Sequence, residues 1–140
     1  MTARYSDHLE ANAALYAGEW LHTGGLGCID AQGFLYFKDR KKDMIKTGGE
    51  NVYPAEVEAV LNLHPDIAEV TVIGLPDPTW GQAVTAVIVP RAGCDLALQD
   101  VAGYKIPKLI KLVDTIPKNE TGKVIKRELR ARFADAPDAR

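Results

Sequence analysis

The sequence predicts a small α+β fold, in which a mixed sheet carries packed helices and is preceded by a β-hairpin. Two runs rich in β-branched residues, 67–75 and 83–89, flank a turn rich in Pro and Gly and predict two sheet strands. Ile125, Leu129 and Phe133 recur at spacings of four and predict a final helix. With 140 residues, the chain has room for one ordinary domain, or for a small domain and a piece of another.

The first third of the chain predicts a hairpin followed by a charged linker. Residues 1–20 form a polar, helix-compatible segment with only a weak apolar stripe. Residues 26–30 and 34–38 are strand-like, and the three residues between them predict a short hairpin turn. The next five residues, 39–43, are all charged. Because such a run cannot easily enter a core, we expect a linker or hinge there.

A glycine pair and a proline-initiated helix follow the linker. Gly48 and Gly49 lack a Cβ, so the backbone can turn sharply or approach another surface closely. Pro54 suits the first turn of a helix, and acidic residues follow it where the helix N-terminus favours negative charge. Pro65 is expected to end this helix.

The last third alternates short regular elements with a loop. Residues 96–102 could form about two helical turns, and residues 108–113 could form a further strand. Residues 117–122 have the Pro, Asn, Thr and Gly content of a loop, which leads into the final helix. Residues 134–140 are expected to fray as a tail.

Composition excludes several classes of protein. With 46% hydrophobic and 26% charged residues, the chain is typical of a globular protein. It has no apolar stretch near the roughly 18 residues that a membrane span requires, and no signal-peptide pattern, so we expect a cytoplasmic protein. Cys28 and Cys94 lack CxxC spacing, and the three histidines are scattered, so no metal site is predicted.

Positive charge is concentrated in one block. Residues 103–132 hold nine Lys or Arg against three acidic residues, although the whole chain has a net charge of -2. The block could attract an anionic partner, or it could be the solvated face of a helix and loop. It lacks interleaved aromatic residues, and the pI is about 5.9, so nucleic acid is not the expected partner.

Lys123 is the candidate catalytic residue. It follows Thr121 and Gly122 and stands at the start of the final helix. The glycine permits close backbone approach to a ligand, and an ammonium there could neutralise phosphate or carboxylate charge that grows in a transition state. The triplet alone is a weak signal, since most Thr-Gly-Lys triplets are surface turns.

Six blocks that occur in order resemble the second half of the superfamily of acyl-CoA synthetases, luciferases and nonribosomal-peptide adenylation domains. The resemblance covers about residues 17–133, and the glycine-pair block is similar to the acid:CoA ligase branch. The blocks are Trp20-Leu21-His22-Thr23-Gly24, Asp39-Arg40-Lys41-Lys42-Asp43-Met44-Ile45, Gly48-Gly49-Glu50-Asn51-Val52-Tyr53-Pro54-Ala55-Glu56-Val57-Glu58, Pro76-Asp77 with Trp80-Gly81, Tyr104-Lys105-Ile106-Pro107-Lys108, and Pro117 with Thr121-Gly122-Lys123.

The resemblance implies a two-step reaction on ATP and CoA. A carboxylate attacks the α-phosphate to give an acyl-adenylate and pyrophosphate, and a thiol then displaces AMP after a C-terminal lid has rotated. Lys123 matches the lysine that contacts the carboxylate and α-phosphate during adenylation. Lys42 matches the hinge about which the lid turns, and Arg40 matches the arginine that helps to hold the ribose. As alternatives, Lys42 could be a solvated linker charge and Gly48-Gly49 only a tight turn.

The same resemblance implies a role for the glycine pair. Gly48, Gly49 and Glu50 match the segment that faces the pantetheine tunnel in the thioester-forming state, where bare backbone can line a narrow passage. Trp80 and Tyr104 are expected to be packing anchors rather than catalysts, since large aromatic side chains usually contribute buried area.

Three departures from the family pattern stand out. The phosphate loop and acid pocket belong to a large N-terminal domain that is missing here. Gly25 stands where the family usually has an aspartate that binds the ribose, a loss worth about 1.5 to 3 kcal/mol of nucleotide binding. Between Asp100 and Gly103 a full helix is missing, so we expect an uncovered sheet face and possible self-association through it.

The expected layout therefore has four parts. Residues 1–38 are a remnant of the N-terminal domain, residues 39–43 the hinge, residues 44–133 the lid and residues 134–140 the tail. The partners implied are the missing domain and a carboxylic acid substrate, with Mg²⁺ held mainly by the missing domain. No substrate is expected to bind tightly to this chain, which should be inactive alone. The alternative is a non-catalytic, lid-like interaction module or a truncated relic.

Overall fold

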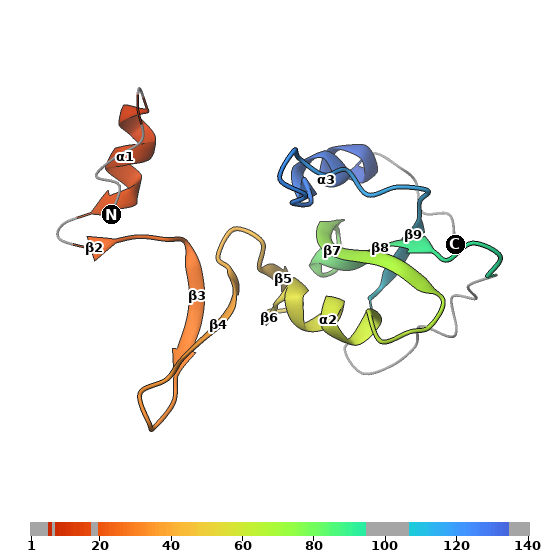
Figure 1. Ribbon diagram of the computed structural model, residues 1–140, viewed down its shortest axis with the longest axis horizontal. Helices are drawn as coiled ribbons and strands as arrows, with labels where there is room; N and C mark the ends of the chain where they lie inside the picture. Colours follow the sequence, from red (N-terminus) through yellow and green to blue (C-terminus); the bar gives the residue numbers. More distant parts are fainter. Residues whose placement is uncertain (1–5, 7, 18–19, 95–106, 135–140) are drawn as a thin grey trace. The chain divides into compact units, whose positions relative to one another are not determined.

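The computed structural model describes residues 6, 8–17, 20–94 and 107–134, which fall into two compact units (Figure 1). The smaller unit is Met1–Lys42 and the larger unit is Asp43–Arg140. The division lies between Lys42 and Asp43, within the run 39–43 that the sequence marks as a linker. Rotation at this point stays a prediction.

The smaller unit begins with a short helix and ends with the predicted hairpin. Helix α1 (Leu9–Leu15) is followed by β1 (Tyr16–Ala17) and β2 (Trp20–Leu21), which pair antiparallel. Strands β3 (Gly25–Ile29) and β4 (Leu35–Arg40) form the second antiparallel pair, so the hairpin prediction is confirmed.

Asp30 organises the turn of this hairpin. Its Oδ1 accepts hydrogen bonds from the backbone N–H groups of Gln32 and Phe34, each at 2.9 Å, and its Oδ2 accepts one from the Tyr36 hydroxyl at 2.9 Å. The Phe34 N–H is the largest of the influences that lower the pKa of this carboxyl, because hydrogen bonds to the ionised form stabilise it. An ionised Asp30 therefore fixes the turn.

The charged run 39–43 differs from the expectation that all of it is solvated. Strand β4 continues through Asp39, which is only 8% exposed, and reaches Arg40. The Asp39 carboxylate accepts a hydrogen bond from the Arg40 backbone N–H at 2.7 Å. The prediction was wrong at this position because the strand extends into the charged run, and the hydrogen bond from Arg40 partly compensates the burial of the carboxylate.

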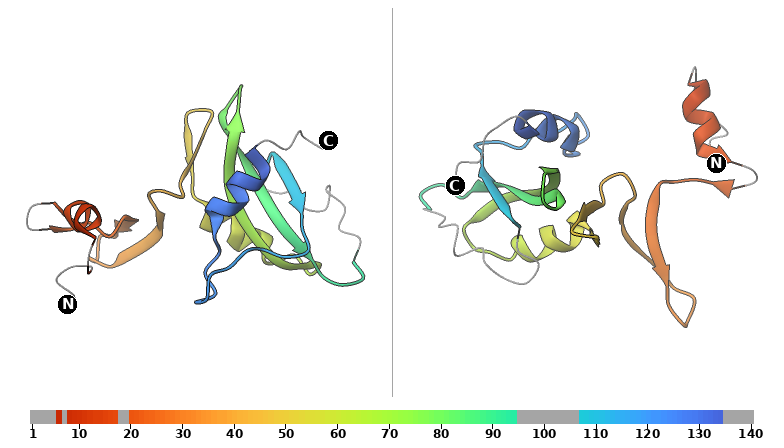
Figure 2. Two further views of the ribbon diagram at one scale, coloured as in Figure 1. Left: turned by 90° about the horizontal axis from the view of Figure 1, so that it is seen from above. Right: turned by 180° about the vertical axis from the view of Figure 1, so that it is seen from behind.

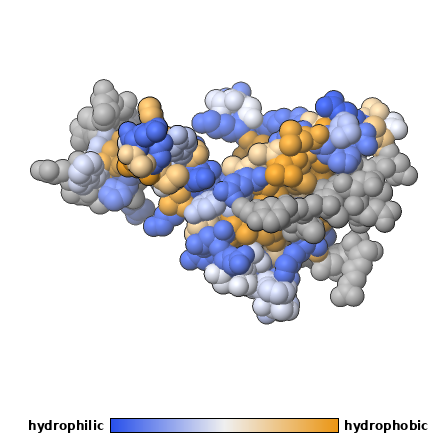
Figure 3. All heavy atoms as spheres, turned by 90° about the horizontal axis from the view of Figure 1, so that it is seen from below, coloured by the Kyte–Doolittle hydropathy of each residue, from blue (hydrophilic) through white to orange (hydrophobic). Residues whose placement is uncertain are grey.

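Large apolar side chains of the hairpin remain exposed. Ile29 is paired with Leu35, and Phe37 is paired with Gly27, so the three large side chains lie on one face of the hairpin. They are 69%, 73% and 67% exposed respectively. Figure 3 shows hydrophobic surface among hydrophilic side chains on this unit. The hairpin therefore presents an exposed apolar face.

The larger unit opens with a glycine-turn hairpin and a helix. Strands β5 (Ile45–Thr47) and β6 (Glu50–Val52) pair antiparallel around the two glycines. Helix α2 (Pro54–Leu61) has Pro54 in its first turn, as predicted. The helix stops at Leu61, a few residues before the proline that was expected to end it.

A three-stranded mixed sheet forms the centre of the larger unit. Strand β7 (Ile67–Asp77) pairs antiparallel with β8 (Gly81–Pro90), and β9 (Leu109–Leu112) pairs parallel with β8. Helix α3 (Lys126–Ala134) packs on β7. Figures 1 and 2 show α2 and α3 on opposite faces of this sheet. The predicted α+β class with a mixed sheet is confirmed.

Alternating residues of β7 and β8 build two cores, one on each face of the sheet. The core beneath α2 contains Ile45, Val57, Leu61, Ile67, Val72, Val84, Ala86 and Ile88. The core beneath α3 contains Ile73, Leu75, Val87, Val113, Ile116 and Leu129. Strand β8 is thus buried on both faces, which explains its continuous apolar run.

Several sequence predictions lie outside the described residues. The short helix 96–102, the missing family helix between residues 100 and 103, and the anchor role of Tyr104 all fall in the segment 95–106. The uncovered sheet face was inferred from that segment and stays a prediction. Within the residues that the structure describes, the helices are too short or too polar to cross a membrane.

Thr47 carries a buried hydroxyl whose Oγ1 has no hydrogen-bond partner among the described residues. Replacing it with the isosteric Val should raise the free energy of unfolding by about 1 kcal/mol, because the desolvation penalty of the hydroxyl is removed. Urea titration measures this change. The control is Thr85→Val, which removes a buried hydroxyl that donates to the Ala83 carbonyl at 3.2 Å. Equal losses of stability in both variants would contradict the prediction.

Candidate functional site

Lys123 sits in a loop that a single asparagine closes. Asn119 Oδ1 accepts hydrogen bonds from the backbone N–H groups of Thr121 and Lys123, at 3.2 and 2.8 Å, and from the Thr121 hydroxyl at 2.9 Å. The Asn119 N–H donates to the Lys123 carbonyl and the Gly122 N–H donates to the Asn119 carbonyl, both at 2.9 Å. Gly122 supplies the positive φ of 78° that the turn requires. The loop is therefore internally rigid.

The side chain of Lys123 is available to a ligand. The residue is exposed, and none of the carboxylates in the described part of the chain forms an ion pair with it. A free ammonium on a loop with fixed backbone can meet an incoming anion without first breaking an internal contact.

Two ion pairs fasten the two ends of this loop to the rest of the larger unit. Before the loop, Lys118 pairs with Glu69 of β7 at 2.7 Å. After it, Lys126 pairs with Glu58 of α2 at 2.8 Å. Lys118 and Val124 also form an isolated antiparallel bridge across the base of the loop. The loop is thus connected to both α2 and β7.

The glycine turn is a second candidate site, packed against Trp80. Gly48 and Gly49 have φ of 57° and 84°, the left-handed pair that a two-residue hairpin turn requires. A Cβ on Gly48 would lie 2.7 Å from the Trp80 ring, whereas one on Gly49 would meet nothing within 4 Å. The Gly48 N–H donates to the Trp80 carbonyl at 3.0 Å. Glu50, the third predicted member of this site, is exposed at the start of β6.

Trp80 itself is nearly half exposed, at 47%, and carries a cation on its face. The Lys108 ammonium lies 3.0 Å from the ring centroid, a cation–π contact. The expected anchor role fits the contact with Gly48, but the exposed ring also forms part of the surface around the glycine turn. A surface with bare backbone, an aromatic face and a cation can accommodate an extended polar chain.

The structure brings together two predicted nucleotide-binding residues of the smaller unit. Gly25 is the register partner of Arg40 in the β3–β4 hairpin. A Cβ on Gly25 would lie 2.8 Å from a ring carbon of Phe37, so a side chain at this position must displace that ring. The pairing of positions 15 residues apart follows from the hairpin register.

Lys42 is exposed and is the last residue of the smaller unit. The next residue, Asp43, forms an ion pair with Arg130 of α3 at 3.1 Å. Asp43 is therefore fastened to α3 within the larger unit, and the hinge role of Lys42 stays a prediction.

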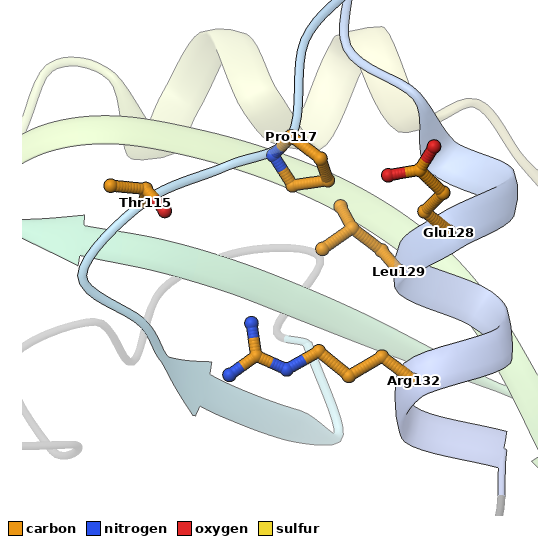
Figure 4. Close-up of a pocket in the computed structure, with 5 residues that line it drawn as sticks. All are labelled: Thr115, Pro117, Glu128, Leu129 and Arg132. Atoms are coloured by element: carbon orange, nitrogen blue, oxygen red, sulfur yellow. The ribbon is translucent and has the colours of Figure 1, made fainter.

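A small pocket lies beside α3 but holds none of the predicted site residues. Its volume is about 300 Å³, at the lower end of ligand pockets, and Thr115, Pro117, Glu128, Leu129 and Arg132 line it (Figure 4). Leu129 points into it from α3 (Figure 4). No cluster of three or more His, Cys, Asp or Glu that could hold a metal occurs among the described residues.

Two residues that shape the Lys123 loop were not predicted from the sequence. Asn119 could have been found, because Asn in a Pro- and Gly-containing loop is the usual acceptor in such turns. Glu58 was interpreted only as a favourable charge near a helix N-terminus. Its pairing with Lys126 joins residues 68 positions apart, and no local pattern signals such a contact.

Comparison with known proteins gives one consistent family. Residues 56–123 match the family model described as the AMP-binding enzyme C-terminal domain. A fatty acid–acyl-carrier-protein ligase of Streptomyces coeruleorubidus is 43% identical over 81% of this chain and 24% of its own length. A long-chain-fatty-acid–CoA ligase of Mycobacterium tuberculosis is 42% identical over 93% of this chain and 27% of its own length.

Solved structures agree with this result. The o-succinylbenzoate CoA synthetase of Bacillus subtilis, solved with its acyl-adenylate intermediate, superimposes with a TM-score of 0.80 and 38% identity. The match covers 96% of this chain and 28% of the synthetase. The chain thus spans about a quarter of the length of the relatives that it matches.

The contact between the glycine turn and Trp80 predicts unequal effects of two similar substitutions. Gly49→Ala should cost about 1 to 2 kcal/mol of unfolding free energy, because alanine resists the left-handed backbone region. Gly48→Ala should cost about 1 kcal/mol more, because its methyl group also collides with the Trp80 ring. Urea titration of both variants measures the difference, and equal costs would show that Trp80 does not pack on this turn.

Proposed function

We propose that this chain, which belongs to the AMP-binding enzyme C-terminal domain family, supplies the adenylation lysine and the thiol-channel loop of an ATP-dependent acid–thiol ligase. The observation that carries the proposal is the unpaired Lys123 ammonium on its rigid, exposed loop. The relatives include a fatty acid–acyl-carrier-protein ligase and a long-chain-fatty-acid–CoA ligase, which supports this reaction class.

The reaction proposed has two balanced steps. In the first, a carboxylate oxygen bonds to the α-phosphorus of ATP, the bond from that phosphorus to the bridging oxygen breaks, and pyrophosphate leaves. In the second, a thiolate sulfur bonds to the acyl carbon, the acyl–phosphate bond breaks, and AMP leaves while the thiol proton passes to solvent. The thioester and AMP are the products.

Lys123 serves the first step. The attacking carboxylate and the triphosphate are both anionic, so their approach is opposed by electrostatic repulsion. The Lys123 ammonium, placed between them, offsets this repulsion and stabilises the charge that develops on the phosphoryl oxygens. The fixed loop backbone also restricts the positions that the ammonium can occupy.

Gly48 and Gly49 serve the second step. Their turn presents backbone without side chains, and the open space beside Gly49 leaves room for the narrow pantetheine arm that CoA and acyl-carrier protein share, while Trp80 fills the space beside Gly48. Glu50 follows directly and stands at the rim of the same passage. The Trp80 ring forms a wall that holds the turn in shape.

The smaller unit contributes nucleotide contacts and the hinge. Arg40 holds the ribose from the end of β4, and Lys42 is the residue about which the larger unit rotates between the two steps. Gly25, opposite Arg40, offers no carboxylate to the ribose hydroxyls. Nucleotide binding therefore depends mainly on the partner domain.

The partner in this proposal is a large N-terminal adenylation domain that provides the acid pocket, the phosphate loop and the Mg²⁺ ligands. The exposed apolar face of the hairpin, formed by Ile29, Leu35 and Phe37, supports a tight contact with such a domain. We propose a cytoplasmic location, where both ATP and CoA are available. The chain by itself has no adenylation activity in this proposal.

Lys123→Ala tests the proposal directly. The chain is mixed with the separately expressed N-terminal domain of the M. tuberculosis ligase, and pyrophosphate release dependent on a long-chain fatty acid is measured. The variant should lose about 100- to 1,000-fold in the adenylation rate, the usual effect of removing one transition-state donor. The matched control is Lys118→Ala, a lysine of the same loop whose ammonium is already paired with Glu69.

The outcomes separate an enzyme from an interaction module. Release that appears on mixing and survives in the Lys118 variant, but not in the Lys123 variant, supports the ligase role. Tight association of the two polypeptides without any gain in pyrophosphate release over the N-terminal domain alone contradicts it, and favours a non-catalytic docking module.

A further inference from the structure

We propose that Glu58 is a positioning residue for adenylation, acting through Lys126 to hold the Lys123 loop in its reactive place. The proposal rests on the function proposed for Lys123. Glu58 would touch neither substrate, and its effect would reach the reaction only through the two lysines.

One oxygen of Glu58 accepts hydrogen bonds from three donors in different parts of the larger unit. Glu58 Oε1 accepts hydrogen bonds from the Val72 backbone N–H at 2.7 Å, from the Thr71 hydroxyl at 3.0 Å and from the Lys126 ammonium at 2.8 Å. Glu58 itself belongs to α2, while Thr71 and Val72 belong to β7. The carboxylate is thus fixed to the sheet, and Lys126 is fixed to the carboxylate.

Lys126 transmits this position to the loop. It is the first residue of α3 and lies three residues after Lys123. Asn119 holds the loop together internally, and the Ile125 N–H donates to the Pro117 carbonyl at 2.9 Å across its base. Because the loop is closed in this way, a displacement of Lys126 moves the Lys123 backbone with it.

The two ion pairs at the ends of the loop differ in exposure. The side chains of Lys126 and Glu58 are 17% and 23% exposed, whereas those of Lys118 and Glu69 are 39% and 45% exposed. An ion pair that is largely withdrawn from water holds its geometry more strongly than one that solvent and salt screen. The Glu58 pair therefore determines where the loop stands, and the Glu69 pair contributes little.

A third pair extends the same arrangement along α3. Arg130 lies one turn after Lys126 and pairs with Asp43, the first residue of the larger unit. Between these two contacts, Leu129 is only 1% exposed and anchors the helix in the core. Helix α3 is thus held along its length, and the loop at its N-terminal end has one defined position.

The first measurement uses the chain alone and follows the mobility of backbone amides by nuclear magnetic relaxation. In Glu58→Gln and in Lys126→Met, the order parameters at Gly122 and Lys123 should fall from the rigid value of about 0.85 toward about 0.6. Those at Val87 and Ile88, in the sheet, should stay unchanged. Glu69→Gln is the matched control and should leave both regions unchanged.

The second measurement uses the mixture with the N-terminal domain. Glu58→Gln should lower kcat for adenylation about ten- to a hundred-fold, the effect of misplacing a catalytic group by about 1 Å, with little change in the KM for the acid. Thioester formation from a supplied acyl-adenylate should change less than about twofold. Lys126→Arg, which keeps the ion pair, should retain the rate that Lys126→Met loses. Both substitutions break the same contact. The double variant Glu58→Gln with Lys126→Met should therefore be no slower than the slower of the two single variants.

These outcomes distinguish a failure of the function proposed for Lys123 from a failure of the positioning role proposed for Glu58. Unchanged adenylation in Lys123→Ala overturns the proposed function, whatever Glu58 does. If Lys123→Ala abolishes adenylation but Lys126→Met leaves both kcat and the loop mobility unchanged, the positioning role is overturned alone. Equal loss of adenylation and thioester formation in Glu58→Gln and Lys126→Met also overturns it, because a general loss of structure would then explain the effect.

Discussion

The organisation of the larger unit depends on the carboxylate of Glu58, which joins α2, β7 and α3 through one oxygen. Each of the two helices packs on the sheet through its own apolar face, yet they cover opposite faces and belong to different cores. Apolar packing alone does not fix how one helix stands relative to the other, because it is non-directional. Hydrogen bonds with defined geometry supply that relation.

The same contacts hold the Lys123 loop within the larger unit and leave the boundary between the two units free of them. The reaction we propose needs a lysine that is held accurately during adenylation, and a larger unit that can rotate as a whole afterwards. Internal contacts such as Lys126–Glu58 and Arg130–Asp43 keep the Lys123 loop attached to its own unit. The unit boundary after Lys42 lies just before Asp43, so these contacts need not break in the rotation that we propose.

The sequence anticipated the fold well where local patterns decide the structure. The β3–β4 hairpin, the glycine turn, the Pro54 start of α2, the strands of the sheet and the Leu129 stripe of α3 all follow from periodicity and turn chemistry. The family assignment was also confirmed by the matched model and the relatives. Helix α2 ends earlier than its proline signal, since nothing in the local sequence fixed that end.

The supporting contacts of the site were harder to predict. Lys123 was identified by resemblance, but the bond from its N–H to Asn119 and the pairing of Lys126 with Glu58 emerged only from the folded chain. Asp39 was misread as solvated because five successive charges suggested a linker, whereas strand pairing buries this one carboxylate. Contacts between residues far apart in sequence depend on tertiary packing, which composition and spacing do not encode.

The most direct test of the central claim is a crystal structure of this chain with an N-terminal adenylation domain and a stable acyl-adenylate analogue. We expect the Lys123 ammonium within about 3.2 Å of a phosphoryl or acyl oxygen. The Glu58–Lys126 pair should be intact in the same structure. A structure in which the Lys123 side chain remains in solvent while the adenylate site is closed, or in which Lys126 has left Glu58, would contradict the account.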